Sequence, residues 1–216
     1  MRERTDLGRT LKLLIALLPL AVVYAQDSAN QTSQSSSGAD RAGTPLSVSQ
    51  KWRLFENETV SPLTLGAGVF NAMLSQATNS DPRYGEGYGP FAQRLGASVA
   101  DIASQNFFGD FLLASVLHED PRYVRMGPGH SFWSRFGYAV SRALVIRSDT
   151  GGNTFNWSNV AGTAMSAGLS NAYYPPASRT GGAMAIHFGT SVMGAGFANL
   201  FPEFWPDFRQ WIRRHH

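Results

Sequence analysis

Apolar residues along this chain form long stretches that are separated by short breaks rich in Pro, Gly and Ser. Because Pro and Gly end helices, each stretch between two breaks predicts one helix. The expected helices cover about 62–76, 91–118, 131–145, 156–172 and 181–200, and a short amphipathic helix follows over about 204–214. No stretch shows the alternation of a strand with hairpin turns. The pattern therefore predicts an all-α fold, a single compact domain of about five helices plus a short C-terminal amphipathic helix.

The central stretch, 91–118, lies between Pro90 and Pro121 and is apolar on most of its circumference. At 1.5 Å per residue it would form a helix of roughly 40 Å. A helix that is apolar nearly all round is buried on several sides. We expect this helix to be the centre of the domain.

Two short motifs recur and predict degenerate helix–loop repeats. A large apolar residue followed by Gly and ending on Val occurs four times, around Gly66, Gly96, Gly137 and Gly189. We expect each of these glycines to lie where the backbone of another helix comes close, and we expect the same of Gly162 and Gly168, which stand in rows of small residues. Asp-Pro-Arg-Tyr occurs at 81–84 and 120–123. This second motif predicts a structural corner built on Asp81, Arg83, Asp120, Arg122 and Tyr123.

The N-terminus is basic, then apolar from Leu13 to Val23, and then small at Ala25. This order predicts a signal peptide over 1–25, cleaved after Ala25, and therefore an exported protein. Residues 26–50 are rich in Ser, Gln and Thr, which predicts a disordered linker. The helical domain is then expected over 51–216.

Charge and cysteine content narrow the function classes. Loss of the leader leaves 14 basic and 13 acidic residues, a net charge of +1, so the alkaline isoelectric point of the whole chain gives no reason to expect nucleic acid as a partner. The chain has no cysteine, which excludes disulfides and a lipid-modified cysteine. Export without cysteine favours a bacterial envelope, periplasmic or membrane-associated. All basic residues of the mature chain except Lys51 are Arg or His, and we expect Arg83, Arg94, Arg122 and Arg135 to bind acids or loop carbonyls inside the domain.

Between Asp149 and Glu203 the only charged residue is Arg179. The helix pair over 156–201 is also rich in small residues spaced four apart, which lets helix axes approach closely. A buried pair in a soluble domain is the preferred interpretation, because Asn156, Asn159 and Ser166 make the first helix polar. Membrane insertion or surface association is the alternative.

The densest polar cluster is His118-Glu119-Asp120, and His130 and His187 are the other candidates for catalysis or metal binding. Neighbouring residues on a helix point about 100° apart, so the run alone cannot chelate a metal, and a helix end is the favoured interpretation. The glycines match neither a P-loop nor a dinucleotide fingerprint. We therefore expect no metal and no cofactor, and no small-molecule ligand is identified.

The segments 117–123 and 170–175 resemble a group of uncharacterised exported bacterial proteins with no known activity. The resemblance implies export and a single domain, and it transfers no function. Two classes of function remain. One is a non-enzymatic structural or interaction protein at a membrane or with another envelope protein. The other is a small metal-dependent or hydrolytic enzyme that uses His118, Glu119, His130 and His187.

Overall fold

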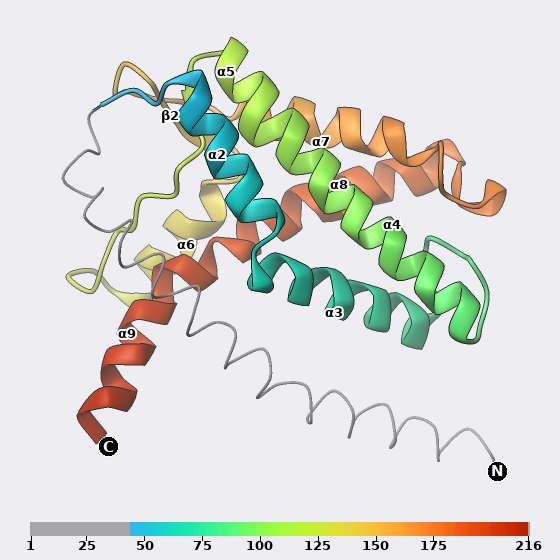
Figure 1. The fold of residues 1–216 in the computed structure, drawn as a ribbon. Coiled ribbons are helices and arrows are strands. Elements are labelled where there is room, and N and C mark those ends of the chain that lie inside the picture. Colours follow the sequence, from blue (N-terminus) through green and yellow to red (C-terminus); the bar gives the residue numbers. More distant parts are fainter. Residues whose placement is uncertain (1–43, 216) are drawn as a thin grey trace.

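The computed structural model describes residues 44–215, and this part of the chain is a mainly α-helical single domain (Figure 1). The helices are α2 (Val48–Thr59), α3 (Pro62–Thr78), α4 (Tyr88–Asn106), α5 (Ala114–Val116), α6 (Phe132–Ser141), α7 (Trp157–Ser170), α8 (Gly181–Ala198) and α9 (Leu200–His215). A π-helix, η2 (Phe107–Leu113), and a 3-10 turn, η3 (Pro176–Ser178), complete the helical part. The prediction of an all-α fold is confirmed. The predicted signal peptide and most of the predicted linker lie outside the described residues.

The predicted central helix is present and runs from Tyr88 to Val116 through α4, η2 and α5. It contacts α3 along α4, and it contacts α7 along both α4 and η2. In Figure 1 α4 is the long green helix that crosses the middle of the domain. The π-helical segment inserts an irregular turn where α2 and α7 both meet the central helix.

Side-chain caps start the helices where the sequence predicts them. The side chains of Ser61, Ser131 and Thr180 accept backbone N–H bonds at the first turns of α3, α6 and α8. Asn156 does the same for α7. Such caps satisfy N–H groups that have no partner within the helix.

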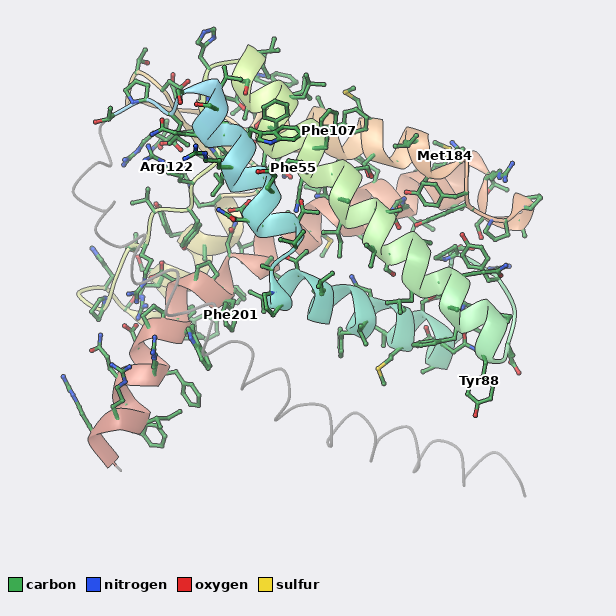
Figure 2. The ribbon with its side chains drawn as sticks, viewed as in Figure 1. Phe55, Tyr88, Phe107, Arg122, Met184 and Phe201 are labelled. Atoms are coloured by element: carbon green, nitrogen blue, oxygen red, sulfur yellow. The ribbon has the colours of Figure 1, made fainter. Side chains whose placement is uncertain are left out.

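One helix begins in the segment expected to be linker. α2 starts at Val48, because Ser47 and Gln50 form a reciprocal capping box that fixes the first turn. Its apolar residues then pack on η2, with the rings of Phe55 and Phe107 5.8 Å apart (Figure 2). The folded domain therefore begins several residues before the predicted boundary at residue 51.

A small antiparallel sheet replaces the end of the predicted third helix. Helix α6 ends at Ser141, and β2 (Val145–Ser148) pairs with both β1 (Glu119–Asp120) and β3 (Asn153–Phe155). Val145 and Ile146 are β-branched and precede a Gly-containing turn, so they favour a strand. The strands are too short to show alternation in the sequence.

The prediction for the recurring glycines is wrong. A Cβ atom added at Gly66, Gly96, Gly137, Gly168 or Gly189 would meet no atom within 4 Å. It is right for Gly162, where an added Cβ would lie 2.5 Å from the backbone nitrogen of Gly109. The motif does not indicate which side of a helix faces a neighbour, and in these cases the glycine lies on another side.

The interior of the domain is made of small and polar residues. Among residues 44–215 no Leu, Phe, Met, Trp or Val is buried, and the buried apolar residues are mostly Ala. The largest fully buried side chains are those of Arg94, Lys51 and Glu203. Close packing of small residues therefore holds the helices together, and the large apolar side chains lie at or near the surface.

Candidate functional site

The His118-Glu119-Asp120 run has a structural role at the sheet. His118 is exposed, and its left-handed backbone (φ 56°) turns the chain from α5 into β1. The buried Glu119 carboxylate accepts the Ser158 N–H at 2.9 Å and so places a negative charge at the N-terminus of α7. Asp120 binds the Arg122 guanidinium through both oxygens, at 2.8 Å from Nε and 2.6 Å from Nη2. Both carboxylates are already bonded within the chain.

The structure does not bring the candidate histidines together. His130 is exposed in the loop before α6, whereas His187 lies on α8 beside Asp101. Across the described part of the chain, no three His, Cys, Asp or Glu side chains converge to hold a metal ion. The structure places His118 between α5 and β1, His130 in the loop before α6 and His187 on α8, so the candidate histidines belong to three separate elements.

The two Asp-Pro-Arg-Tyr segments differ in structure. In the first, a cis bond joins Asp81 to Pro82, Asp81 accepts the Ser178 hydroxyl at 2.7 Å, and Arg83 is largely exposed. The loop is organised instead by the buried Arg94, which donates to the carbonyls of residues 80, 82 and 85. The expectation of internal arginine contacts is confirmed for Arg94, Arg122 and Arg135. It is wrong for Arg83, whose guanidinium is 3.4 Å from Asp81 near the surface.

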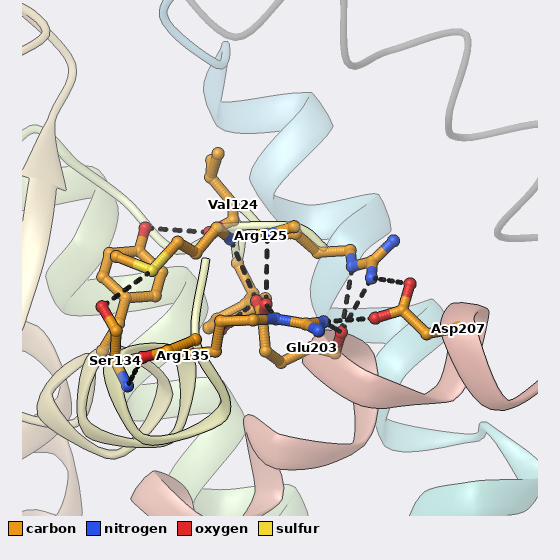
Figure 3. Close-up of polar contacts among 11 residues, drawn as sticks. Val124, Arg125, Ser134, Arg135, Glu203 and Asp207 are labelled. Carbon is orange, nitrogen blue, oxygen red and sulfur yellow. Dashed lines mark hydrogen bonds and ion pairs between the residues drawn. The ribbon is translucent and has the colours of Figure 1, made fainter. Parts of the chain in front are cut away.

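A second buried charge cluster joins α9 to the rest of the domain (Figure 3). Glu203 is fully buried and accepts bonds from Arg135 Nε at 2.7 Å, from the Tyr123 hydroxyl at 2.9 Å and from the N–H groups of Met126 and Gly127. Burial alone would raise the pKa of Glu203, but these hydrogen bonds outweigh it and hold the pKa below 4.5. Every oxygen of this carboxylate is in use, so the cluster is a structural contact.

A third cluster connects α4, the loop after α7, and α8. The Asp101 carboxylate accepts the hydroxyls of Tyr173 and Tyr174, each at 2.6 Å, and lies 3.8 Å from His187 Nε2. Burial raises the pKa of Asp101 although both tyrosines and His187 oppose that shift. Burial and the neighbouring Asp101 also raise the pKa of each phenol, so the tyrosines stay protonated and act as donors. This arrangement fixes three elements and presents no activated nucleophile.

One pair of half-buried acids lies where α2 meets η2. Glu58 on α2 and Asp110 on η2 each lie one turn beyond the packed rings of Phe55 and Phe107. Burial, and for Glu58 also the charge of Asp110, raises the pKa of Glu58 to about 8. Burial raises the pKa of Asp110 to about 7. At neutral pH at least one of the two carboxyl groups at the interface between α2 and η2 is therefore partly protonated.

The most distinctive surface of the domain is apolar. On α3 the exposed side chains of Leu63, Phe70 and Leu74 lie on one stripe, because they are spaced seven and then four residues apart. On α8, Ile186, Met193 and Phe197 repeat that spacing, with exposures of 66%, 61% and 49%. Soluble monomers rarely expose large apolar side chains in such rows. These two stripes, together with the aromatic residues of α9, form the candidate functional site.

Comparison with protein-family models, with curated proteins and with solved structures found no match to this chain. Within residues 44–215, no helix combines the length and the apolar character that crossing a membrane requires.

Sequence reasoning missed several of the residues that organise the charge clusters. Glu203 and Lys51 are buried and Asp101 is half-buried, and the partners of all three are far away along the chain; Lys51, for example, binds Asp149 at 2.9 Å. The sequence marks Lys51 in one way, since it is the only lysine after the predicted leader. The spacing of apolar residues along α3 and α8 can be read from the sequence, but it does not show which side of each helix faces the solvent.

Proposed function

We propose that this chain is an exported bacterial envelope protein with a non-enzymatic interaction role, exerted at a membrane surface or on another envelope protein. The main support is the distribution of side chains. Large apolar residues lie on the outer faces of α3, α8 and α9, while charged and small residues fill the interior. Removing one such side chain from water is worth about 1.5–3 kcal/mol, so the stripes favour association. The N-terminal leader pattern supports export.

The close contacts inside the domain support the same proposal. Gly162 of α7 lies against Gly109 of η2, and Gly196 of α8 lies against the Val140 carbonyl, so that these elements pack through backbone and small residues. Packing of that kind is used where apolar side chains are needed on the outside, as at lipid-facing helices. It leaves the large side chains of α7 and α8 available to a partner.

The enzymatic alternative has no comparable support. It relies on His118, Glu119, His130 and His187, and the carboxylate of Glu119 is committed to the α7 backbone. The geometry therefore favours a binding surface over a reaction centre.

Cell fractionation tests the proposal. The protein is expressed with its own leader, and the soluble periplasmic material is separated from the membranes, which are then washed with alkaline carbonate. We expect the protein in the membrane fraction, with release by the wash if it lies on the surface and retention if it is inserted. Recovery in the soluble fraction as a free monomer would contradict the proposal.

A further inference from the structure

Helix α9 has two chemically distinct sides. Glu203 and Asp207, four residues apart, mark the side that faces the domain, where Arg135 binds both acids and Arg125 binds Asp207 at 2.9 Å (Figure 3). In Figure 1 the rest of α9 runs out from the body of the domain toward the C-terminal end. The buried Glu203 and the half-buried Asp207 are therefore both paired with arginines of the domain and do not contribute free negative charge to the helix.

A continuous row of aromatic rings winds along α9, from the side opposite Glu203 to Trp211, one turn beyond Asp207. Phe201, Trp205, Phe208 and Trp211 follow one another with ring centroids 5.2, 5.8 and 6.1 Å apart. Phe208 and Trp211 are 51% and 57% exposed. Trp and Phe on one face of an amphipathic helix are typical of helices that lie in the interface of a bilayer.

The charge of the last two turns is uniformly basic. After Asp207 the sequence contains Arg209, Arg213 and Arg214 and no acid. The side chains of Arg213 and Arg214 are exposed. Arg214 and Trp211 also border a surface hollow of about 340 Å³, whose one carboxylate, Asp207, already binds two arginines. An anionic group at this end would meet positive charge and aromatic surface together.

We propose that α9 binds the surface of an anionic phospholipid bilayer, with Phe208 and Trp211 in the interfacial layer and Arg213 and Arg214 on lipid phosphates. This inference rests on the proposed function and names the partner for one of its surfaces. Charge complementarity selects lipid over a protein partner here. The helices α3 and α8 contain no arginine, whereas α9 combines aromatic rings with the exposed Arg213 and Arg214, the combination that anionic lipid surfaces attract.

Vesicle binding tests the proposal. Protein purified from the envelope of expressing cells is mixed with vesicles of phosphatidylglycerol and phosphatidylcholine, and with vesicles of phosphatidylcholine alone. We expect binding to the mixed vesicles, weakening as salt is raised, and little binding to phosphatidylcholine. The double variant Arg213→Gln/Arg214→Gln should bind about 25-fold more weakly, since each basic residue near an anionic surface contributes a factor of about five. Phe208→Ala/Trp211→Ala should lose about tenfold or more.

Matched variants at distant surface positions serve as controls. Arg53→Gln/Arg83→Gln removes the same charge from exposed positions elsewhere, and Tyr88→Ala removes an aromatic ring that is 97% exposed at the far end of the domain from α9 (Figure 2). Both controls should bind like the unaltered protein, and circular dichroism should show that all variants keep their helices.

Three results would overturn the inference: equal binding to both kinds of vesicle, binding that is insensitive to salt, or α9 variants that bind like the controls. If the protein nevertheless stays with cell membranes on fractionation, the proposed function stands and only the role of α9 is wrong. If it binds neither vesicles nor cell membranes, and no envelope protein either, both fail.

Discussion

At the scale of single residues, the tightest contact at any described glycine is between Gly162 and Gly109. An added Cβ at Gly162 would lie 2.5 Å from the nitrogen and 2.6 Å from the Cα of Gly109, a contact that real side chains do not make. Both atoms belong to backbone, so neither can move without shifting η2 or α7. Of the six glycines for which the sequence predicts a close helix contact, Gly162 is the one at which the structure shows it.

Gly162→Ala should destabilise the domain by about 1–3 kcal/mol because the methyl group overpacks the contact with η2. Gly168→Ala, on the same helix, has nothing within 4 Å and should be neutral or stabilising by about 0.5–1 kcal/mol, through helix propensity. Urea unfolding of both variants gives the comparison. Equal effects of the two substitutions would show that α7 does not approach η2 as described.

Glu203→Gln should cost about 3 kcal/mol or more, because an amide cannot accept the four hydrogen bonds that the carboxylate receives and leaves Arg135 less compensated. Glu56→Gln, at an exposed position of α2, is the control and should change little. The measurement is the unfolding free energy at neutral pH. A loss no larger than that of the control would mean that α9 is held to the domain in some other way.

Glu203 also determines how far the domain remains stable at acid pH. The pKa of Glu203 is held below its unfolded value of 4.5, as that of Asp207 is held below 3.8, so their contribution is complete above about 4.5 and is lost as the pH falls through the folded pKa values. We expect the thermal midpoint to fall steeply with acidification below about pH 4.5, and to fall less steeply in Glu203→Gln. Identical pH profiles of the two proteins would contradict this assignment.

Residue roles could be predicted from the sequence where they depend on near neighbours. The turn at His118 to Pro121 and the bond between Asp120 and Arg122 are local, and their structural role was foreseen. The contacts of Glu203 and Asp101 were not foreseeable, because Glu203 binds residues 68 to 80 positions away and Asp101 binds Tyr173 across 72 positions. The glycine motif failed because composition does not fix the rotation of a helix against its neighbour.

At the scale of elements, α2 and η2 meet through an aromatic cluster and the acid pair Glu58 and Asp110. Trp52 and Phe111 have ring centroids 4.8 Å apart in an edge contact, and Phe55 packs on Phe107. Protonated carboxyl groups suit this apolar interface, and ionised ones do not. The attachment of α2 to the central helix should therefore depend on pH.

We expect stability to decrease as the pH rises from about 4.5, the unfolded pKa of Glu58, to about 8, its folded pKa. The sign follows because an acid with a raised folded pKa binds its proton more tightly in the native state, so loss of the proton costs native stability. Glu58→Gln and Asp110→Asn should flatten this slope, as followed by thermal unfolding across the range. Unchanged slopes in both variants would show that the pair is hydrated.

The positions of the helices were largely predictable, because Pro, Gly and capping residues mark their ends. Two elements were not predicted for a physical reason. Helix α2 lies in a polar stretch and is stabilised by tertiary contact of Trp52 and Phe55 with η2, which local sequence does not show. Strands β2 and β3 are four and three residues long, below the length at which alternation is visible.

At the scale of the whole molecule, the domain has charged and small residues in its interior and large apolar residues on its surface. Charged pairs such as Arg135 and Glu203 are buried, and apolar stripes on α3 and α8 are exposed. Exposing these apolar side chains to water costs free energy, and binding to a partner that covers them would recover it. The all-α class was predictable from the helical period, but this distribution was not, because the same period fits a core-facing or an outward-facing stripe.

The most direct test of this claim is to make the α8 stripe polar and to measure both location and stability. In Ile186→Ser/Met193→Ser we predict that the protein shifts from the membrane fraction to the soluble fraction while its unfolding midpoint stays the same or rises. The control Ile146→Ser, at a buried position of β2, should keep its location and lose about 2–5 kcal/mol of stability. If the α8 variant instead loses stability as the control does and keeps its location, the stripe belongs to a core, and the proposed binding surface is wrong.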